Sequence, residues 1–375
     1  MDLTLSEDQK LLRDSVERML AGTYDFDARR GWLEAEGWSR ENWGRFAEQG
    51  LLAAPLPEAH GGLGGGPVEV MLIAEAFGAA LVLEPFIPCV VLGAGLVAAA
   101  GNEAQKAAIL PAVASGEQVL AAGLYEAQGR YRLAPAQTRA RRDGAGWVLD
   151  GRKGVVVGAP QADVLLISAR TGGADGEASG VSLFLVPARA PGVSLTPYAL
   201  QDGRRAGEVR LDGVRLGAEH LLGEEGGALP FIEVAVDHAI AATCAEAVGA
   251  MRAIHQSTLA YARERKQFGE PLAAFQVLQH RMVDMYIAVE QAVSASYLAS
   301  LRLAGQERAK ACAAAKVQVG KSARLVGQGA VQIHGGMGVT NELKAAHLFK
   351  RLIMFEADFG DAEHHLRRFA ALAAA

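Results

Sequence analysis

The chain has 375 residues, 50% of them hydrophobic, so it can bury two or three separate cores. Its formal net charge of -5 includes no long basic block, which argues against nucleic acid as a partner. No stretch reaches the roughly 18 uninterrupted apolar residues of a membrane span, and the charged, polar start does not resemble a signal peptide. We therefore expect a cytoplasmic protein with no membrane partner.

The first 117 residues have the pattern of a helical domain. Ser6 and Gln9 form a capping-box pair ahead of apolar residues at helical spacing. A second helix is expected near residues 40–49. The apolar stretches 68–83 and 90–99 are typical of helices that are buried on most sides.

Residues 118–226 have the pattern of a β domain. Short apolar runs alternate with glycine, proline and aspartate, which predicts an antiparallel barrel or sandwich. The expected strands are 119–124, 146–149, 154–157, 164–168, 181–186 and 207–211.

Residues 227–375 have the pattern of long helices. Leu278, Met282 and Met285 recur at helical spacing, which predicts the core face of a bundle helix. An alanine-rich helix is expected from 309 to about 327.

Three cysteines, Cys89, Cys244 and Cys312, lie far apart along the chain. Their odd number fits a reducing compartment, and their spacing suits neither a disulfide framework nor a zinc site, so we expect no metal. Each is interpreted as a small buried apolar residue rather than a nucleophile.

Two segments of the C-terminal third carry a family resemblance. The first reads Arg-Glu-Arg-Lys-Gln-Phe-Gly from Arg263 and continues to Gln276, and the second reads Gln-Ile-His-Gly-Gly-Met-Gly from Gln332. Both are similar to signatures of the acyl-CoA dehydrogenase family. The resemblance spans essentially the whole chain and implies an α+β fold with an N-terminal helical domain, a middle antiparallel β-barrel domain and a C-terminal four-helix bundle. The same order follows from the residue patterns, with domains at 1–117, 118–226 and 227–375.

The resemblance implies that the chain binds FAD. An arginine fork can neutralise the pyrophosphate of the dinucleotide, and a glycine turn lets the backbone approach it closely. Taken singly, the arginine would instead lie in an exposed charge cluster and the glycines would only end a helix. The cofactor residues implied by the resemblance are Arg265, Phe268, Gln276, Gln332, Gly335 and Gly336.

In the family, such residues serve FAD that is bound largely by a neighbouring subunit. The resemblance therefore implies a homologous partner subunit, in a dimer or a dimer of dimers. It also implies an acyl-CoA substrate and an electron-transfer flavoprotein as electron acceptor.

The position of the catalytic carboxylate departs from the family pattern. The family reaction needs a carboxylate base to remove the proton next to the thioester carbonyl. Alignment with the family's Tyr-Glu-Gly motif places Gly360 at this position. In some members the base lies on an earlier helix instead, and the corresponding residue here is Ala239.

Three nearby carboxylates are substitutes: Asp361, Asp237 and Glu356. Asp361 is the first candidate base, although it also suits the N-cap of a following helix. Asp237 and Glu356 are interpreted as solvated or salt-bridged residues. The paired His364 and His365 fit either a proton relay or an exposed helix start.

The middle domain departs from the family pattern as well. Val155, Val156 and Val157 stand where the family has a Trp-Ile-Thr run that addresses the flavin ring. Valine offers no side-chain hydrogen bond, so the ring would depend on backbone groups or on another subunit. This pattern is similar to the small-subunit branch of the family, whose members pair with a larger subunit that supplies the glutamate.

Three functions are compatible with these residues. The leading hypothesis is an FAD-dependent acyl-CoA dehydrogenase subunit that desaturates an acyl-CoA, with Asp361 as the base. The rival is a non-catalytic partner that completes the FAD site of a large homologous subunit. A related flavin oxidase that uses oxygen is the third. The residues leave the acyl group of the substrate open.

Overall fold

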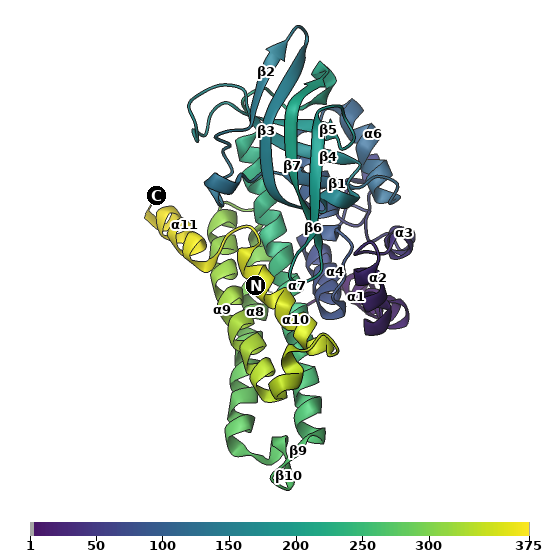
Figure 1. The fold of residues 1–375 in the computed structure, drawn as a ribbon, viewed down its shortest axis with the longest axis vertical. Helices are drawn as coiled ribbons and strands as arrows, with labels where there is room; N and C mark the ends of the chain where they lie inside the picture. The colour runs from purple at the N-terminus through teal and green to yellow at the C-terminus, as the bar shows by residue number, and fades with distance from the viewer. Residues whose placement is uncertain (1–3, 375) are drawn as a thin grey trace. The chain divides into compact units, whose positions relative to one another are not determined.

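The computed structural model describes residues 4–374 and has helices, then a β-rich segment, then further helices (Figure 1). The α+β fold class is confirmed. The predicted domain boundaries stay predictions. Among the described residues, none of the helices is both long enough and apolar enough to cross a bilayer.

Contacts divide the chain into two compact units. The first unit contains the chain up to Glu34, Pro67–Val82 and Ile240 onwards, and the second contains Ala35–Gly66 and Leu83–Ala239. The helix α7 (Leu229–Glu264) begins in the second unit and continues into the first.

The remaining helices of the first unit come from both ends of the sequence. They are α1 (Glu7–Thr23), α2 (Phe26–Glu34), α4 (Pro67–Ala80), α8 (Gln276–Arg302), α9 (Arg308–His334), α10 (Lys344–Ala357) and α11 (Ala362–Ala374). A short hairpin, β9 (Lys266–Gln267) and β10 (Glu270–Pro271), joins α7 to α8. Helix α9 packs against α8, α10 and α11, which makes it the centre of this unit.

Two sequence predictions for these helices are confirmed. The N-terminus of α1 is a capping box, in which the Ser6 hydroxyl accepts from the Gln9 amide at 3.2 Å and the Gln9 side chain accepts from the Ser6 amide at 3.0 Å. In α8, Met282 and Met285 are buried core residues.

Helices α4 and α7 approach each other closely through glycines. A Cβ atom at Gly249 of α7 would overlap the carbonyl oxygen of Glu75 in α4. A Cβ atom at Gly78 of α4 would overlap the carbonyl oxygen of Glu246 in α7. Any side chain at either glycine would therefore push the two backbones apart.

The second unit is built on one sheet with the strand order β6-β7-β3-β2-β4-β5-β8, with β1 also paired to β4. Most pairings are antiparallel, while β1 and β2 pair with β4 in parallel. The strands are β1 (Leu120–Gly123), β2 (Arg139–Asp143), β3 (Gly146–Val157), β4 (Val164–Arg170), β5 (Val181–Pro187), β6 (Val193–Ala199), β7 (Arg205–Leu216) and β8 (Leu221–Leu222). The helices are α3 (Arg40–Glu48), α5 (Gly95–Ala100), α6 (Glu103–Ala114) and a π-helical segment at Ile87–Ala94.

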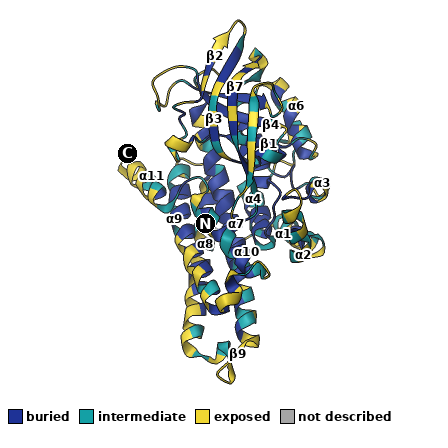
Figure 2. Ribbon diagram, in the orientation of Figure 1, coloured by how far each residue is buried: buried dark blue, intermediate teal, exposed yellow. Residues whose placement is uncertain are grey.

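The strand pattern differs from the predicted one at four places. The runs at 146–149 and 154–157 form the single strand β3, because two bulges interrupt its register with β7 without ending it. Strands β2 and β6 and the two-residue strand β8 were not predicted. Strand β2 is mostly charged and exposed and has no apolar alternation (Figure 2). Strand β6 is a largely exposed edge strand in which Pro197 ends a short alternation of Val193 and Leu195 with polar residues.

We predict that Gly249→Ala destabilises the protein by more than about 3 kcal/mol or prevents folding, because the new methyl group would meet the backbone of α4. The measurement is the midpoint of chemical or thermal unfolding. Gly320→Ala is the matched control, since Gly320 is also a buried helical glycine but its Cβ would lie 3.9 Å from the nearest atom. The control should be neutral or up to about 1 kcal/mol more stable. An unchanged midpoint for Gly249→Ala would contradict the close crossing of α4 and α7.

Candidate active site at two ends of the helical bundle

The first group of predicted site residues lies where α7 ends. After Glu264 the chain forms the β9–β10 hairpin, whose turn contains Phe268 at φ +55 and Gly269 at φ +88. The Phe268 side chain is 95% exposed. Positive φ values at both residues are those of a two-residue hairpin turn, and this turn holds the Phe268 ring in solvent.

The second group lies at the end of α9. The Tyr261 hydroxyl donates to the backbone oxygen of His334 at 3.4 Å, and the two rings stack with centroids 4.5 Å apart. This contact brings the Gly335–Gly336 turn to the end of the bundle that carries the β9–β10 hairpin (Figure 1). The structure thus brings together the two segments that were far apart in the sequence.

This shared end, which we call the bundle tip, consists of the six predicted cofactor residues. Among residues 4–374, the Arg265 guanidinium makes no ion pair. A Cβ atom at Gly335 or Gly336 would meet no atom within 4 Å, so their backbone is open to an incoming group. Gln276 and Gln332 are exposed as well.

The turn between α10 and α11 is not part of the bundle tip. It contains Gly360, which occupies the position of the family's glutamate. Gly360 has φ +120, a conformation that L side chains rarely adopt. A Cβ atom on it would lie 2.7 Å from His364 Cδ2 and 2.7 Å from His365 Nε2. The two imidazole rings therefore fill the space that a glutamate side chain would need.

A buried lysine fixes the backbone of this turn. Lys316 of α9 is 2% exposed, and its ammonium group donates to the carbonyl oxygens of Phe355 at 2.6 Å, Glu356 at 3.3 Å and Gly360 at 2.8 Å. Burial lowers the pKa of Lys316. Because Lys316 bonds both the end of α10 and the turn, neither moves without breaking a charged hydrogen bond.

His365 adds a further bond to the same turn. Its Nε2 lies 3.1 Å from the carbonyl oxygen of Phe359, so this nitrogen donates its proton there. Burial, followed by the nearby charges of Lys316 and His364, lowers the pKa of His365 to about 3. The ring is thus neutral at physiological pH and acts as a structural donor.

The substitute carboxylates have other partners or are buried. One oxygen of Asp361 accepts from the His364 amide at 2.8 Å, which is the N-cap bond of α11. Glu356 pairs with Arg324 at 2.9 Å, as its salt-bridge interpretation expected. Asp237 is fully buried in α7, so its interpretation as a solvated residue is wrong, and Ala239 at the alternative base position is buried as well.

The bundle tip and the Gly360 turn are well separated. Lys316 contacts Gly360, and Gln332 lies 16 residues further along the same helix, which corresponds to roughly 24 Å at 1.5 Å per residue. One protomer therefore presents its cofactor residues far from the turn where the base would lie.

Comparison with known proteins identifies the family of this chain. The profiles for the N-terminal, middle and C-terminal domains of acyl-CoA dehydrogenases match residues 6–117, 121–214 and 229–373. The chain is 32% identical to the acyl-CoA dehydrogenase FadE12 of Mycobacterium tuberculosis over 91% of this chain and 89% of that protein. The chain belongs to the acyl-CoA dehydrogenase family.

Solved structures agree with the family assignment. A chain of the Tcur3481–Tcur3483 steroid ACAD is 30% identical and matches with a TM-score of 0.89 over 99% of both chains. A chain of the ChsE4–ChsE5 complex from Mycobacterium tuberculosis is 27% identical and matches with a TM-score of 0.91 over 100% of this chain and 99% of that one.

Acyl-CoA dehydrogenases are flavin-dependent oxidoreductases that act on CH–CH bonds, and FAD is the cofactor of this family. The bundle tip fits such a cofactor, because it combines a guanidinium without an ion pair, an open glycine backbone and an exposed aromatic ring. These features are suited to a dinucleotide phosphate. When bound, FAD would supply the hydride acceptor.

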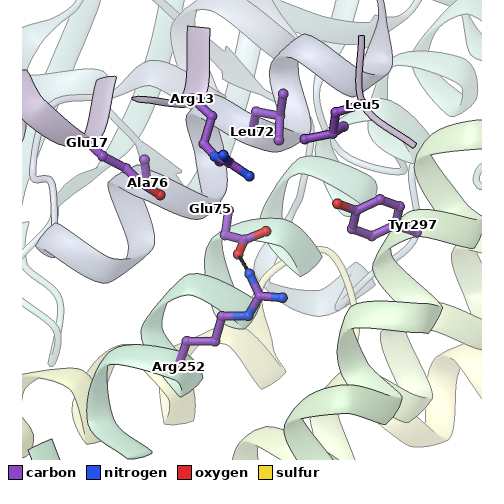
Figure 3. Close-up of a pocket in the computed structure, with 8 residues that line it drawn as sticks. All are labelled: Leu5, Arg13, Glu17, Leu72, Glu75, Ala76, Arg252 and Tyr297. Carbon is purple, nitrogen blue, oxygen red and sulfur yellow. Dashed lines mark hydrogen bonds and ion pairs between the residues drawn. The ribbon is translucent and has the colours of Figure 1, made fainter. Parts of the chain in front are cut away.

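The cavity drawn in Figure 3 lies in the first unit and contains none of the predicted site residues. Its volume is about 210 Å³, and it is lined by Leu5, Arg13, Glu17, Leu72, Glu75, Ala76, Arg252 and Tyr297. Glu75 pairs with Arg252 across it, yet burial raises the pKa of Glu75 more than Arg252 lowers it. Sequence reasoning missed this cluster because its residues come from the N-terminal segment and four helices that are distant in sequence.

We predict that Gly360→Ala destabilises this acyl-CoA dehydrogenase by about 2–4 kcal/mol, because the methyl group adds both backbone strain and a clash with two histidines. Denaturant unfolding measures the effect. Gly336→Ala is the control, since nothing lies within 4 Å of its Cβ position. A Gly360→Ala protein as stable as the wild type would show that the turn has room for a side chain.

Proposed function

We propose that this chain is the subunit of a heteromeric FAD-dependent acyl-CoA dehydrogenase that lacks the catalytic base. In this proposal a larger homologous subunit supplies the base, and this chain completes the FAD site of that subunit. The observation that carries the proposal is the closure of the Gly360 position by His364 and His365. A carboxylate cannot occupy that position without rebuilding the turn.

The proposed reaction is the α,β-desaturation of an acyl-CoA thioester. A carboxylate of the large subunit would serve as the base for the proton next to the thioester carbonyl, and bound FAD would supply the acceptor for the hydride of the adjacent carbon. We further propose that an electron-transfer flavoprotein then takes up the electrons. The acyl group of the substrate is left open by the residues described here.

This chain's proposed contribution is the bundle tip. The Arg265 guanidinium would pair with the pyrophosphate, while the Gly335–Gly336 backbone and Gln332 would approach the nucleotide. Phe268 and Gln276 would border it. The bundle tip is roughly 24 Å along α9 from the Gly360 turn. We therefore propose that the FAD molecule it binds belongs mainly to the partner subunit.

The exposed face of α8 supports a protein partner. Four apolar side chains on this helix are at least half exposed to solvent. They are Val277, Val283, Tyr286 and Ile287. Val283, Tyr286 and Ile287 are neighbours at helical spacing. Neighbouring exposed apolar residues on a folded protein are typical of an interaction surface, and we propose that the homologous subunit covers them.

A self-sufficient dehydrogenase with Asp361 as the base is the second candidate. It is favoured by one observation, namely that Asp361 lies next to the closed position and is partly exposed, with one carboxylate oxygen in the N-cap bond. A related flavin oxidase would differ by forming peroxide without an added acceptor.

The experiment that tests the proposal is purification of this chain alone and after co-expression with large homologous subunits, with bound flavin counted per subunit. We expect the chain alone to be inactive towards acyl-CoA and the complex to hold FAD and bleach when substrate is added. A chain that is yellow and active by itself would refute the base-free assignment.

We predict that Asp361→Asn leaves the turnover of the assembled enzyme within about twofold of the wild type. Asparagine is as good an N-cap as aspartate but is not a base, so the variant separates the two roles of Asp361. The steady-state rate with an artificial electron acceptor measures this. A loss of 100-fold or more, on the order expected when a general base is removed, would instead assign the proton abstraction to Asp361.

We predict that Arg265→Ala weakens FAD binding by about 10–100-fold while the fold is kept, because a charged hydrogen bond to phosphate is lost. Flavin occupancy after gel filtration and far-UV circular dichroism measure the two effects. Arg263→Ala is the matched control, since it removes the same charge two residues earlier at an exposed site. Equal flavin occupancy in both variants would remove Arg265 from the cofactor site.

A further inference from the structure

The cavity of the first unit lies between four helices and the segment before α1 (Figure 3). Its volume is about 210 Å³, which equals the liquid volume of roughly seven water molecules at about 30 Å³ each. Helices α1, α4, α7 and α8 each contribute at least one lining side chain, and Leu5 adds another from the segment before α1. No lining residue belongs to the bundle tip or to the Gly360 turn, so neither of the proposed functional parts uses this space.

The helices around the cavity are held in place by contacts outside it. Glu75 lies one turn before Gly78 on α4, and Arg252 lies one turn after Gly249 on α7, so both are next to the close crossing of these helices. Helix α1 is joined to α4 by Gln9, whose side-chain amide donates to a carboxylate of α4 at 2.9 Å. The cavity is therefore bounded by elements whose positions do not depend on what fills it.

Charged groups of both signs line this space. The side chains of Arg13 from α1 and Tyr297 from α8 point toward the space beside Glu75 of α4 (Figure 3). Glu17 and Arg252 complete the polar lining. Two guanidinium groups and two carboxylates give the lining no net charge.

Several of these groups have hydrogen-bonding capacity that no neighbour uses. Arg13 bonds one oxygen of Asp14 through Nε at 3.0 Å and through Nη2 at 2.9 Å, which leaves its Nη1 group. Glu75 uses only one carboxylate oxygen in its ion pair across the cavity. Within the part of the chain that the structure describes, the Tyr297 hydroxyl makes no hydrogen bond. Donors and an acceptor are thus available to a molecule in the cavity.

The Glu75 carboxylate is incompletely compensated by its arginine partner. Burial raises the pKa of Glu75, Arg252 opposes this rise, and the charge of Glu17 adds to it. A positive group beside Glu75 would lower that pKa again, because it stabilises the charged carboxylate. Burial and the charge of Glu75 also raise the pKa of Tyr297, so its hydroxyl keeps its proton at neutral pH and serves as a donor.

We propose that this cavity binds a small zwitterion, namely an α-amino acid with a short apolar side chain. Its ammonium group would lie against Glu75 and Glu17, and its carboxylate would accept hydrogen bonds from Arg13 and Tyr297. A simple anion would face two carboxylates and a simple cation two guanidinium groups, so a ligand with both charges matches the lining better than either. The ligand's side chain would contact the apolar part of the lining, which consists of Leu5, Leu72 and Ala76.

The first test is titration of the full chain, in the assembled form in which it is purified, with glycine, L-alanine and L-valine. Calorimetry and the midpoint of thermal unfolding measure binding. We expect a Kd of about 0.1–1 mM, as suits a ligand of roughly five to eight non-hydrogen atoms, and a midpoint that rises with ligand concentration. Acetate and methylammonium each carry only one of the two charges and should bind at least about tenfold more weakly.

The second test uses conservative variants that line the cavity. Tyr297→Phe removes only the hydroxyl group and should raise the Kd for L-alanine about tenfold, because a hydrogen bond to a charged group is lost. Glu17→Gln removes one charge at an exposed position and should raise it about two- to fivefold. Tyr286→Phe is the matched control, since Tyr286 is on the same helix as Tyr297 but does not line the cavity. It should bind like the wild type.

Three outcomes overturn the inference. The first is that none of the three amino acids binds the wild-type protein at about 10 mM, where a site of the expected affinity would be mostly filled. The second is that acetate or methylammonium binds as tightly as L-alanine, which would exclude a zwitterion site. The third is that Tyr286→Phe weakens binding as much as Tyr297→Phe. Flavin occupancy and turnover test the proposed function separately, so either proposal can fail without the other.

Discussion

The three hydrogen bonds from the Lys316 ammonium group to backbone carbonyls fix the conformation of the end of α10 and of the turn that follows it. Placing an ammonium group where it has almost no solvent contact costs free energy unless its donors are satisfied. Here the carbonyl oxygens of Phe355, Glu356 and Gly360 satisfy them. Two of these carbonyls belong to the last turn of α10, where a positive charge is also favoured by the helix dipole. The turn is thereby held with φ +120 at Gly360, a conformation that excludes a side chain.

The helical parts of the fold were predictable from local patterns, whereas parts of the sheet were not. The capping box of Ser6 and the apolar stripe of α8 depend on residues within a few turns of each other. Strand β2 was missed because its residues, Arg-Ala-Arg-Arg-Asp, carry no apolar alternation, and its place in the sheet is set by its neighbours. The alanine-rich helix was expected to end near 327 but continues to His334, because Tyr261 of α7 supports its last turn.

The candidate site also has features that were predictable from local sequence patterns and features that depend on the folded chain. The missing glutamate could be read from the sequence, because a motif fixes the position of Gly360. The obstruction of a side chain at position 360 could not be predicted from the sequence, because it depends on Lys316 and two histidines that meet only in the folded chain. A single lysine among alanines suggests a solvent-exposed helix face, and no local pattern indicates that it is buried. Likewise, no local pattern indicates that Lys153 is paired with Glu126, which lies 27 residues earlier in the sequence.

In this chain the predicted cofactor residues and the position expected for the catalytic base lie in two separate parts of the fold. The bundle tip keeps the groups that suit a dinucleotide, and it leaves them exposed without an ion pair at Arg265 among the described residues. The Gly360 turn is closed, rigid and free of any carboxylate at the expected position. If one chain had to do both tasks, a rigid turn without a base would serve no purpose, since proton abstraction needs a carboxylate within hydrogen-bond reach of the substrate. A rigid turn is instead useful when another subunit must be met in a fixed shape, because ordering a flexible turn at an interface costs free energy on association. The closed turn and the exposed tip are consistent with the proposal that the cofactor and the base are shared between unlike subunits.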